Sequence, residues 1–231
     1  MAAAEASESI VIPVTQGQIA ADLRMPSSAA GLVVFAHGSG SSRFSSRSRA
    51  VAAHLESRRF GTLLLDLLTR EEEVIDLHTR EYRFDIERLA GRVVLAADWA
   101  AGRDDLGSLP LGLFGASTGA AAALMAAAER PALVRAVVSR GGRPDLAHDA
   151  LARVQAPTLL IVGGHDEPVI EMNRDAMRRM TALVELEIVP GATHLCEERG
   201  ALERVMHLAA DWFHRHLPRA DDSRGAGRGP S

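Results

Sequence analysis

Ser117 is the residue of this 231-residue chain whose neighbours most strongly indicate nucleophilic chemistry. It is the centre of Gly115-Ala-Ser-Thr-Gly119, which follows the apolar run Leu111–Phe114 and precedes the alanine-rich stretch Ala120–Ala128. A strand, a sharp turn and a helix in this order push the serine hydroxyl outward, and the small flanking residues leave room for the turn. The same serine could instead be an ordinary helix N-cap, so the motif alone leaves both interpretations open.

Two residues further along supply what a serine nucleophile needs, a base that takes its proton and an acid that orients the base. Asp166 follows the apolar run Pro157–Val162, and His194 ends the loop Pro190–His194. Sites in open α/β sheets form outside the carboxyl ends of the strands, so we expect these side chains to converge with Ser117. Taken singly, Asp166 could be a helix-start carboxylate and His194 a turn-capping histidine, but the order Ser, Asp, His favours catalysis.

The segment His37-Gly-Ser-Gly40 follows another apolar run directly and suits a loop that binds an oxyanion. In acyl transfer the tetrahedral intermediate carries a negative oxygen, which backbone N–H groups must reach without crowding by side chains. We predict that the donors are the N–H groups of Ser39 and of Thr118, the residue after the nucleophile. His37 is expected to brace the loop by hydrogen bonds rather than to act as a base.

Arginine residues are frequent in the loops expected near this site, among them Arg43 and Arg140. A guanidinium binds a carboxylate or phosphate at two points, so both residues are candidates for substrate binding, and an anionic ester or lactone is one candidate substrate. The argument has limited force because all 26 basic residues are arginine, and every exposed cation of the chain is therefore an arginine.

The elements that must position these residues alternate between short β-branched or leucine-rich runs and longer stretches of helical period. This pattern predicts the α/β class, with an eight-stranded, mostly parallel sheet and helices on both faces. The expected strands are Ser9–Val14, Ile19–Met25, Leu32–Ala36, Gly61–Leu67, Leu111–Gly115, Arg135–Ser139, Pro157–Gly163 and Val184–Val189, the first two forming an antiparallel hairpin. The expected helices are Ser46–Arg58, Phe84–Ala101, Ser117–Glu129, Val169–Met180 and Leu202–His216, with a short one after Pro144.

The lengths of the connections predict one domain over residues 1–218, followed by a mobile tail over 219–231. About seventeen residues separate Ser139 from Pro157, which is too few for a large cap domain. The longer connection Asp66–Arg83 contains Glu71, Glu72 and Glu73. It is the best candidate for a lid, although an acidic run is more often a solvated face, and we favour the solvated face.

Composition excludes several classes of function. The formal charge of −4 provides no basic field for nucleic acid or an anionic membrane, and neither partner is expected. The absence of lysine excludes Schiff-base and P-loop chemistry, and the single cysteine, Cys196, excludes disulfides and a cysteine-rich metal site. No apolar run reaches the ~20 residues of a membrane span. One cysteine fits a reducing compartment, and the absence of lysine beside many alanines is typical of a GC-rich genome, so we expect a cytoplasmic, bacterial protein. The sequence makes no prediction of its oligomeric state.

The four motifs together resemble the α/β-hydrolase superfamily, and within it the dienelactone-hydrolase-like group, over roughly Ser9–Pro218. The resemblance implies an α/β-hydrolase fold that hydrolyses a small carboxylic ester or lactone through an acyl-enzyme, without cofactor or metal. It implies that Ser117 is the nucleophile, Asp166 the orienting acid and His194 the base. Dienelactone hydrolases themselves use a cysteine nucleophile, and this departure argues against dienelactone as the substrate.

Three alternatives stay open. The same catalytic residues could pass the acyl group to an acceptor other than water, which would make the protein an acyltransferase. A ligand-binding or signalling protein could keep the fold with little turnover. The resemblance also implies a phosphoribosyltransferase as a candidate partner, because related hydrolase domains are sometimes fused to one, but no residue of this chain indicates it.

Overall fold

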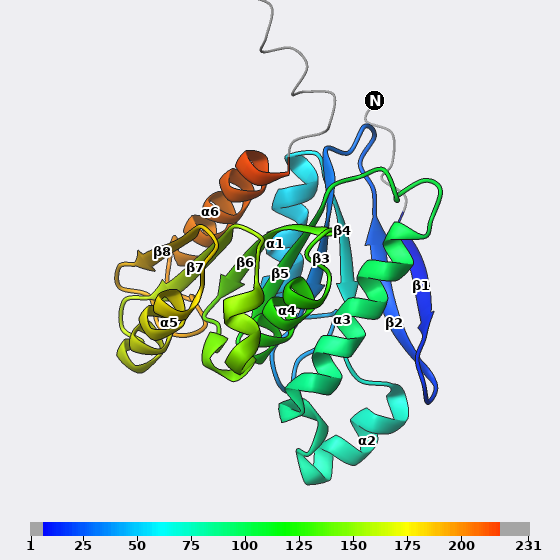
Figure 1. Ribbon diagram of the computed structural model, residues 1–231, viewed down its shortest axis with the longest axis horizontal. Coiled ribbons are helices and arrows are strands. Elements are labelled where there is room, and N and C mark those ends of the chain that lie inside the picture. The colour runs from blue at the N-terminus through cyan, green and yellow to red at the C-terminus, as the bar shows by residue number, and fades with distance from the viewer. Residues whose placement is uncertain (1–6, 218–231) are drawn as a thin grey trace, which may run out of the picture.

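An eight-stranded sheet is the centre of the computed structural model, which describes residues 7–217 (Figure 1). The strand order is β1-β2-β4-β3-β5-β6-β7-β8. The strands β1 and β2 form the predicted antiparallel hairpin, β2 also pairs antiparallel with β4, and all other neighbours are parallel. The strands are β1 (Ser7–Pro13), β2 (Gln18–Arg24), β3 (Gly31–Ala36), β4 (Phe60–Leu65), β5 (Leu111–Ala116), β6 (Val134–Arg140), β7 (Thr158–Gly163) and β8 (Val184–Val189). The predicted mostly parallel sheet of eight strands is confirmed.

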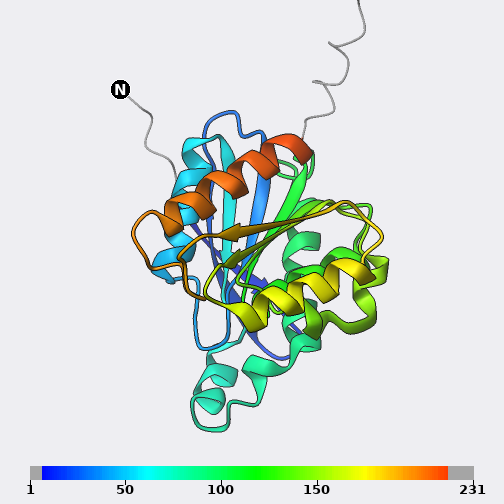
Figure 2. The ribbon, with the colours of Figure 1, turned by 90° about the vertical axis from the view of Figure 1, so that its left-hand side faces the viewer.

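Helices cover both faces of the sheet, as predicted, and the two layers stand on either side of it in Figure 2. One layer consists of α1 (Ser46–Ser57) and α6 (Ala201–His216), which pack against each other. The other contains α3 (Ile86–Ala101), α4 (Thr118–Glu129), α5 (Glu167–Arg179) and the 3₁₀ segment η2 (Pro144–Arg153). Between β6 and β7 the chain forms only η2 and short loops, so the expectation of no large cap domain is confirmed.

The three strands β3, β5 and β7 are buried along their whole length. Their near-continuous apolar sequence follows from this position, because a central parallel strand has a helix layer on each side and no face toward water. Each of these strands ends in a loop at the same edge of the sheet, and the loops after β3, β5 and β7 contain His37, Ser117 and Asp166.

A helix that the sequence analysis did not predict, α2 (Arg70–Thr79), follows β4 and is joined to α3 by the 3₁₀ turn η1 (Tyr82–Phe84). The acidic run was interpreted as a solvated face, and this is wrong for Glu72, which is 8% exposed. Its carboxylate accepts a hydrogen bond from the N–H of Thr69 in a capping box and from the guanidinium groups of Arg88 and Arg92. Glu72 therefore anchors α2 to α3.

A second buried carboxylate, Asp76, fixes the other end of α2. It accepts hydrogen bonds from the backbone N–H groups of Tyr82 and Arg83 and from Arg83 Nε at 2.6 Å. Burial alone would raise the pKa of Asp76, but the hydrogen bonds and the charge of Arg83 outweigh it and hold the pKa below its ordinary value. The helix is thus held at both ends by charged hydrogen bonds and forms a fixed wall.

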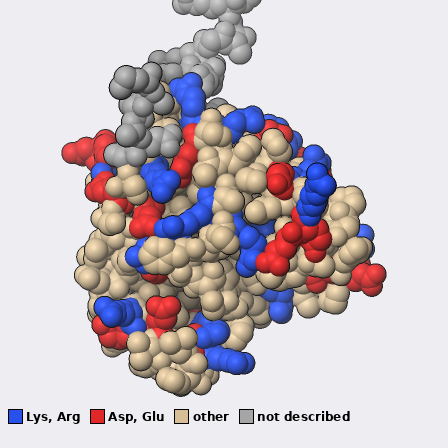
Figure 3. Space-filling view, turned by 180° about the vertical axis from the view of Figure 1, so that it is seen from behind, with Lys and Arg blue, Asp and Glu red and all other residues tan. Residues whose placement is uncertain are grey.

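Acidic and basic side chains lie interspersed on the face of the molecule shown in Figure 3. No helix within residues 7–217 has the length and apolar character needed to cross a membrane. The predicted tail over residues 219–231 lies outside the described part of the chain, and the single-domain and cytoplasmic assignments stay predictions.

The substitution Glu72→Ala tests the role of the buried carboxylate. It removes the capping box and leaves Arg92 buried without its partner, so we expect the free energy of unfolding to fall by about 3 kcal/mol in urea denaturation. The control is Glu71→Ala, because Glu71 is exposed on the same helix turn. Equal stability of the two variants would contradict the anchoring role.

Candidate active site

Ser117 occupies a sharp turn between β5 and α4, with φ 52° and ψ −121°. A residue with a side chain rarely adopts a positive φ, and such conformations are stored mainly at functional sites. The Ser117 side chain makes no capping hydrogen bond, although Ser117 is the N-cap residue of α4. The N-cap interpretation therefore does not account for this hydroxyl, which is available for other chemistry.

Two glycines allow the turn at Ser117 to lie against the loop that follows β3. A Cβ atom on Gly119 would be 2.3 Å from the carbonyl oxygens of Ala36 and His37, far inside van der Waals contact. A Cβ atom on Gly38 would be 3.1 Å from that of Ser117. The backbones of the two turns consequently approach more closely than any larger residue at position 119 would permit.

The side chains of Asp166 and His194 meet at the carboxyl ends of β7 and β8. His194 Nδ1 is 2.6 Å from Asp166 Oδ2, so this nitrogen carries the proton and donates to the carboxylate, which leaves Nε2 as an acceptor. Asp166 is the N-cap residue of α5 but makes no capping hydrogen bond. The side chain of His194 is 37% exposed and that of Asp166 is 16% exposed, so the pair can be reached from solvent at the histidine.

The segment Arg140–Gly141, at the end of β6, brings Ser117 and His194 together. The backbone N–H of Ser117 donates to the carbonyl oxygen of Arg140 at 3.2 Å. On the other side, Arg140 Nη1 donates to the carbonyl oxygen of His194 at 3.5 Å, and a Cβ on Gly141 would be 3.5 Å from His194 Cε1. The three residues predicted to converge thus lie at one edge of the sheet.

The two predicted oxyanion donors, Ser39 and Thr118, lie on the two turns that touch. Within residues 7–217, neither backbone N–H donates to a protein acceptor. Thr118 is the first residue of α4, where the N–H groups have no partner inside the helix and the helix dipole favours negative charge. Both N–H groups are therefore free to bind an anionic oxygen.

His37 braces the loop, as the sequence analysis expected. Its Nδ1 donates to the carbonyl oxygen of Gly38 at 2.8 Å, and its Nε2 accepts from the N–H of Leu67 at 3.1 Å. Burial lowers the pKa of His37 from its ordinary 6.5, although the Gly38 hydrogen bond and nearby carboxylates oppose the shift. With both ring nitrogens engaged, His37 joins β3 to the loop after β4 and has no lone pair left for a substrate.

The two arginines predicted to bind substrate have different surroundings. Arg43 forms ion pairs with Asp66 and Asp22 and stacks over Phe44 at 4.1 Å, so its donors are engaged in the scaffold. Arg140 is 6% exposed beneath the His194 loop, where burial lowers its pKa. This geometry favours structural roles, and substrate binding by either residue stays a prediction.

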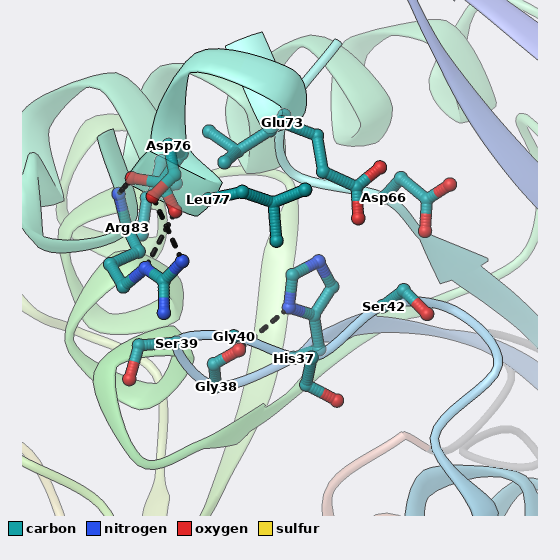
Figure 4. A pocket seen from close by; sticks show the side chains of 13 residues that line it. His37, Gly38, Ser39, Gly40, Ser42, Asp66, Glu73, Asp76, Leu77 and Arg83 are labelled. Carbon is teal, nitrogen blue, oxygen red and sulfur yellow. Dashed lines mark hydrogen bonds and ion pairs between the residues drawn. The ribbon is translucent and has the colours of Figure 1, made fainter. Parts of the chain in front are cut away.

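A cavity of about 70 Å³ opens beside the loop His37–Ser42 and was not foreseen (Figure 4). Its far wall consists of α2 and η1, which contribute Glu73, Leu77 and Arg83. The spacing of Thr69 and Glu72 is a capping-box signature and could have indicated the start of α2, but no local pattern indicates that Arg83 faces the site. Residues 7–217 contain no cluster of His, Cys, Asp or Glu suited to a metal ion.

Comparison of this chain with known proteins points to one family. A profile of the dienelactone hydrolase family matches residues 19–217. The crystal structure of a dienelactone hydrolase from Anabaena variabilis is 54% identical, covers 92% of this chain and 99% of its own, and has a TM-score of 0.90. The structure of Est1E from Butyrivibrio proteoclasticus has a TM-score of 0.75 at 16% identity and covers 90% of this chain and 98% of its own, which is a likeness of fold.

Curated relatives carry a different name. Two Mycobacterium tuberculosis proteins, from strains CDC 1551 and H37Rv, are 56% identical to this chain over 199 residues. Both have the provisional name phosphoribosyl transferase. The match covers 86% of this chain but only 44% of either relative, so the chain spans less than half the length of these proteins.

The substitution Gly119→Ala tests the contact between the two turns. The added methyl group would collide with two carbonyl oxygens, so we expect the free energy of unfolding to fall by about 2 kcal/mol and the reactivity of Ser117 to fall with it. The control is Gly91→Ala on α3, where a Cβ meets nothing within 4 Å. That variant should gain up to about 1 kcal/mol from helix propensity. Unchanged stability and reactivity in Gly119→Ala would contradict the close approach.

Proposed function

The chain belongs to the dienelactone hydrolase family, and from this premise we propose that it is a serine hydrolase that cleaves a small carboxylic ester or lactone. Ser117 is the nucleophile, His194 the general base and Asp166 the acid that orients the base. The observation that carries the proposal is the 2.6 Å hydrogen bond between His194 Nδ1 and Asp166, next to a serine whose hydroxyl does not cap its helix.

The reaction has two halves. Ser117 Oγ attacks the carbonyl carbon and passes its proton to His194 Nε2, while the N–H groups of Ser39 and Thr118 stabilise the negative oxygen. His194 then protonates the leaving alcohol, and the acyl group stays on Ser117. A water molecule attacks this acyl-enzyme with His194 again as the base, which releases the acid and restores the serine.

A serine nucleophile depends on its general base more strongly than a cysteine nucleophile does. A serine hydroxyl is a weak nucleophile unless an adjacent base takes its proton, whereas a thiol ionises more readily. The one cysteine, Cys196, is buried two residues after His194, and burial raises the pKa of its thiol. It is therefore protonated and inaccessible, and we assign it no role in the chemistry.

The name of the Mycobacterium tuberculosis relatives suggests phosphoribosyl transfer, but these proteins are more than twice as long as the region that matches. We assign that activity to the part of the relatives that this chain does not span. For this chain, an acceptor other than water and a binding function with little turnover are the alternatives that the experiment must separate.

Covalent labelling with a fluorophosphonate, followed by peptide mapping, tests the proposal. We expect one label on Ser117, and labelling at least about 100-fold slower in His194→Ala, because a general base typically contributes that much. The variant Ser117→Ala should take no label, whereas Ser108→Ala, at an exposed loop serine, should react like the parent protein.

Several outcomes of the labelling experiment would contradict the proposal. A label on another serine, or labelling of Ser117 that does not need His194, would mean that the serine is not activated as proposed. A folded protein that takes no label would favour the binding function. If labelling succeeds, product analysis with water and an added alcohol or amine decides between a hydrolase and an acyltransferase.

A further inference from the structure

The proposed function assigns no role to the side chains that α2 and η1 contribute to the cavity beside the loop His37–Ser42. Its floor is the loop that contains Ser39, one of the proposed oxyanion donors, and its far wall is α2 with η1 (Figure 4). Because Asp76 and Glu72 fix α2, this wall is part of the folded structure. A substrate held by Ser39 would therefore have one end directed into a preformed cavity.

The order of the strands indicates which half of an ester enters the cavity. The cavity lies at the β3 and β4 side of Ser117, whereas Asp166 and His194 follow β7 and β8 on the other side. The base protonates the leaving alcohol, so the alcohol must lie on the His194 side. The acyl group then extends toward the cavity.

The two ends of the cavity carry opposite hydrogen-bonding groups. Arg83 binds Asp76 through Nε and donates from Nη2 to the carbonyl oxygen of Asp76, but its Nη1 has no partner within residues 7–217. A Cβ on Gly40 would be 3.3 Å from this nitrogen, and Figure 4 shows it directed toward the loop at Ser39 and Gly40. This end of the cavity offers a donor.

The other end offers an acceptor. Glu73 and Asp66 lie there together (Figure 4). Arg43 pairs with Asp66, whereas the Glu73 carboxylate forms no ion pair or hydrogen bond with any residue in the described part of the chain. Leu77, which is 67% exposed, lies between the two ends and offers an apolar surface.

Resting on the proposed hydrolase function, we propose that this cavity is the acyl subsite and that it selects a short acyl group bearing a hydroxyl rather than a carboxylate. A hydroxyl can donate a hydrogen bond to the Glu73 carboxylate, which lies at the end of the cavity opposite Arg83. A carboxylate in the same place would be repelled by Glu73. A volume of about 70 Å³ is small for a ligand pocket, so we expect a short acyl group.

The test compares esters of one alcohol that differ only in the acyl group: acetyl, hydroxyacetyl and hemimalonyl. The parent protein should hydrolyse the hydroxyacetyl ester with a kcat/KM about 10-fold above that of the acetyl ester, as expected for one hydrogen bond to a charged group. Glu73→Met should reduce this ratio to about one, and Glu73→Gln, which keeps an acceptor, should restore most of it. Glu71→Met is the control, because Glu71 lies on the same helix outside the cavity lining.

Binding without turnover separates this proposal from the hydrolase function. Methyl hydroxyacetate should bind the Ser117→Ala variant more tightly than methyl acetate in ligand-observed NMR, and Glu73→Met in that background should abolish the difference. If that holds while no ester is hydrolysed, the subsite stands and the hydrolase function fails. If esters are hydrolysed through Ser117 with acetyl or anionic acyl groups preferred, or if Glu73→Met leaves the hydroxyl preference intact, the subsite is overturned.

Discussion

The contact between the turn after β3 and the first turn of α4 is the constraint on which the site depends. Positions 38 and 119 must be free of larger side chains, because Gly119 lies against two carbonyl oxygens and Gly38 against Ser117. This contact brings the loop that contains Ser39 against the turn that contains Thr118, and Ser117 in that turn has a positive φ and makes no capping hydrogen bond. The parallel pairing of β3 with β5 aligns the ends of the two strands, so the two turns begin at the same level of the sheet.

The strand order then divides the surroundings of Ser117 into two sides. Asp166 and His194 come from β7 and β8, and their hydrogen bond sets the tautomer of the imidazole. On the opposite side, α2 is held by Glu72 and Asp76 and closes the cavity. We propose that the His194 side carries out proton transfer and that the α2 side recognises the acyl group.

The sequence was sufficient for the parts of the molecule that depend on local pattern. The eight strands follow from apolar runs with clear boundaries, and Ser117, Asp166 and His194 follow from small-residue turns at strand ends. Helix α2 was missed because three successive glutamates conceal that the middle one is buried against Arg88 and Arg92. The sequence does not show which arginine faces the site, because this depends on tertiary contacts. Arg43 pairs with Asp66 and Asp22, whereas Nη1 of Arg83 has no partner within residues 7–217 and lies toward the loop His37–Ser42.

Trapping of the acyl-enzyme tests the central claim, that Ser117 is an activated nucleophile, most directly. Intact-mass measurement after rapid mixing with an activated acetyl ester should show a gain of one acetyl group that forms before steady-state turnover and maps to the peptide containing Ser117. The modification should be absent in Ser117→Ala and form much more slowly in His194→Ala. Turnover of the ester without acetyl on Ser117, or acetyl found on another residue at the same rate, would contradict the account.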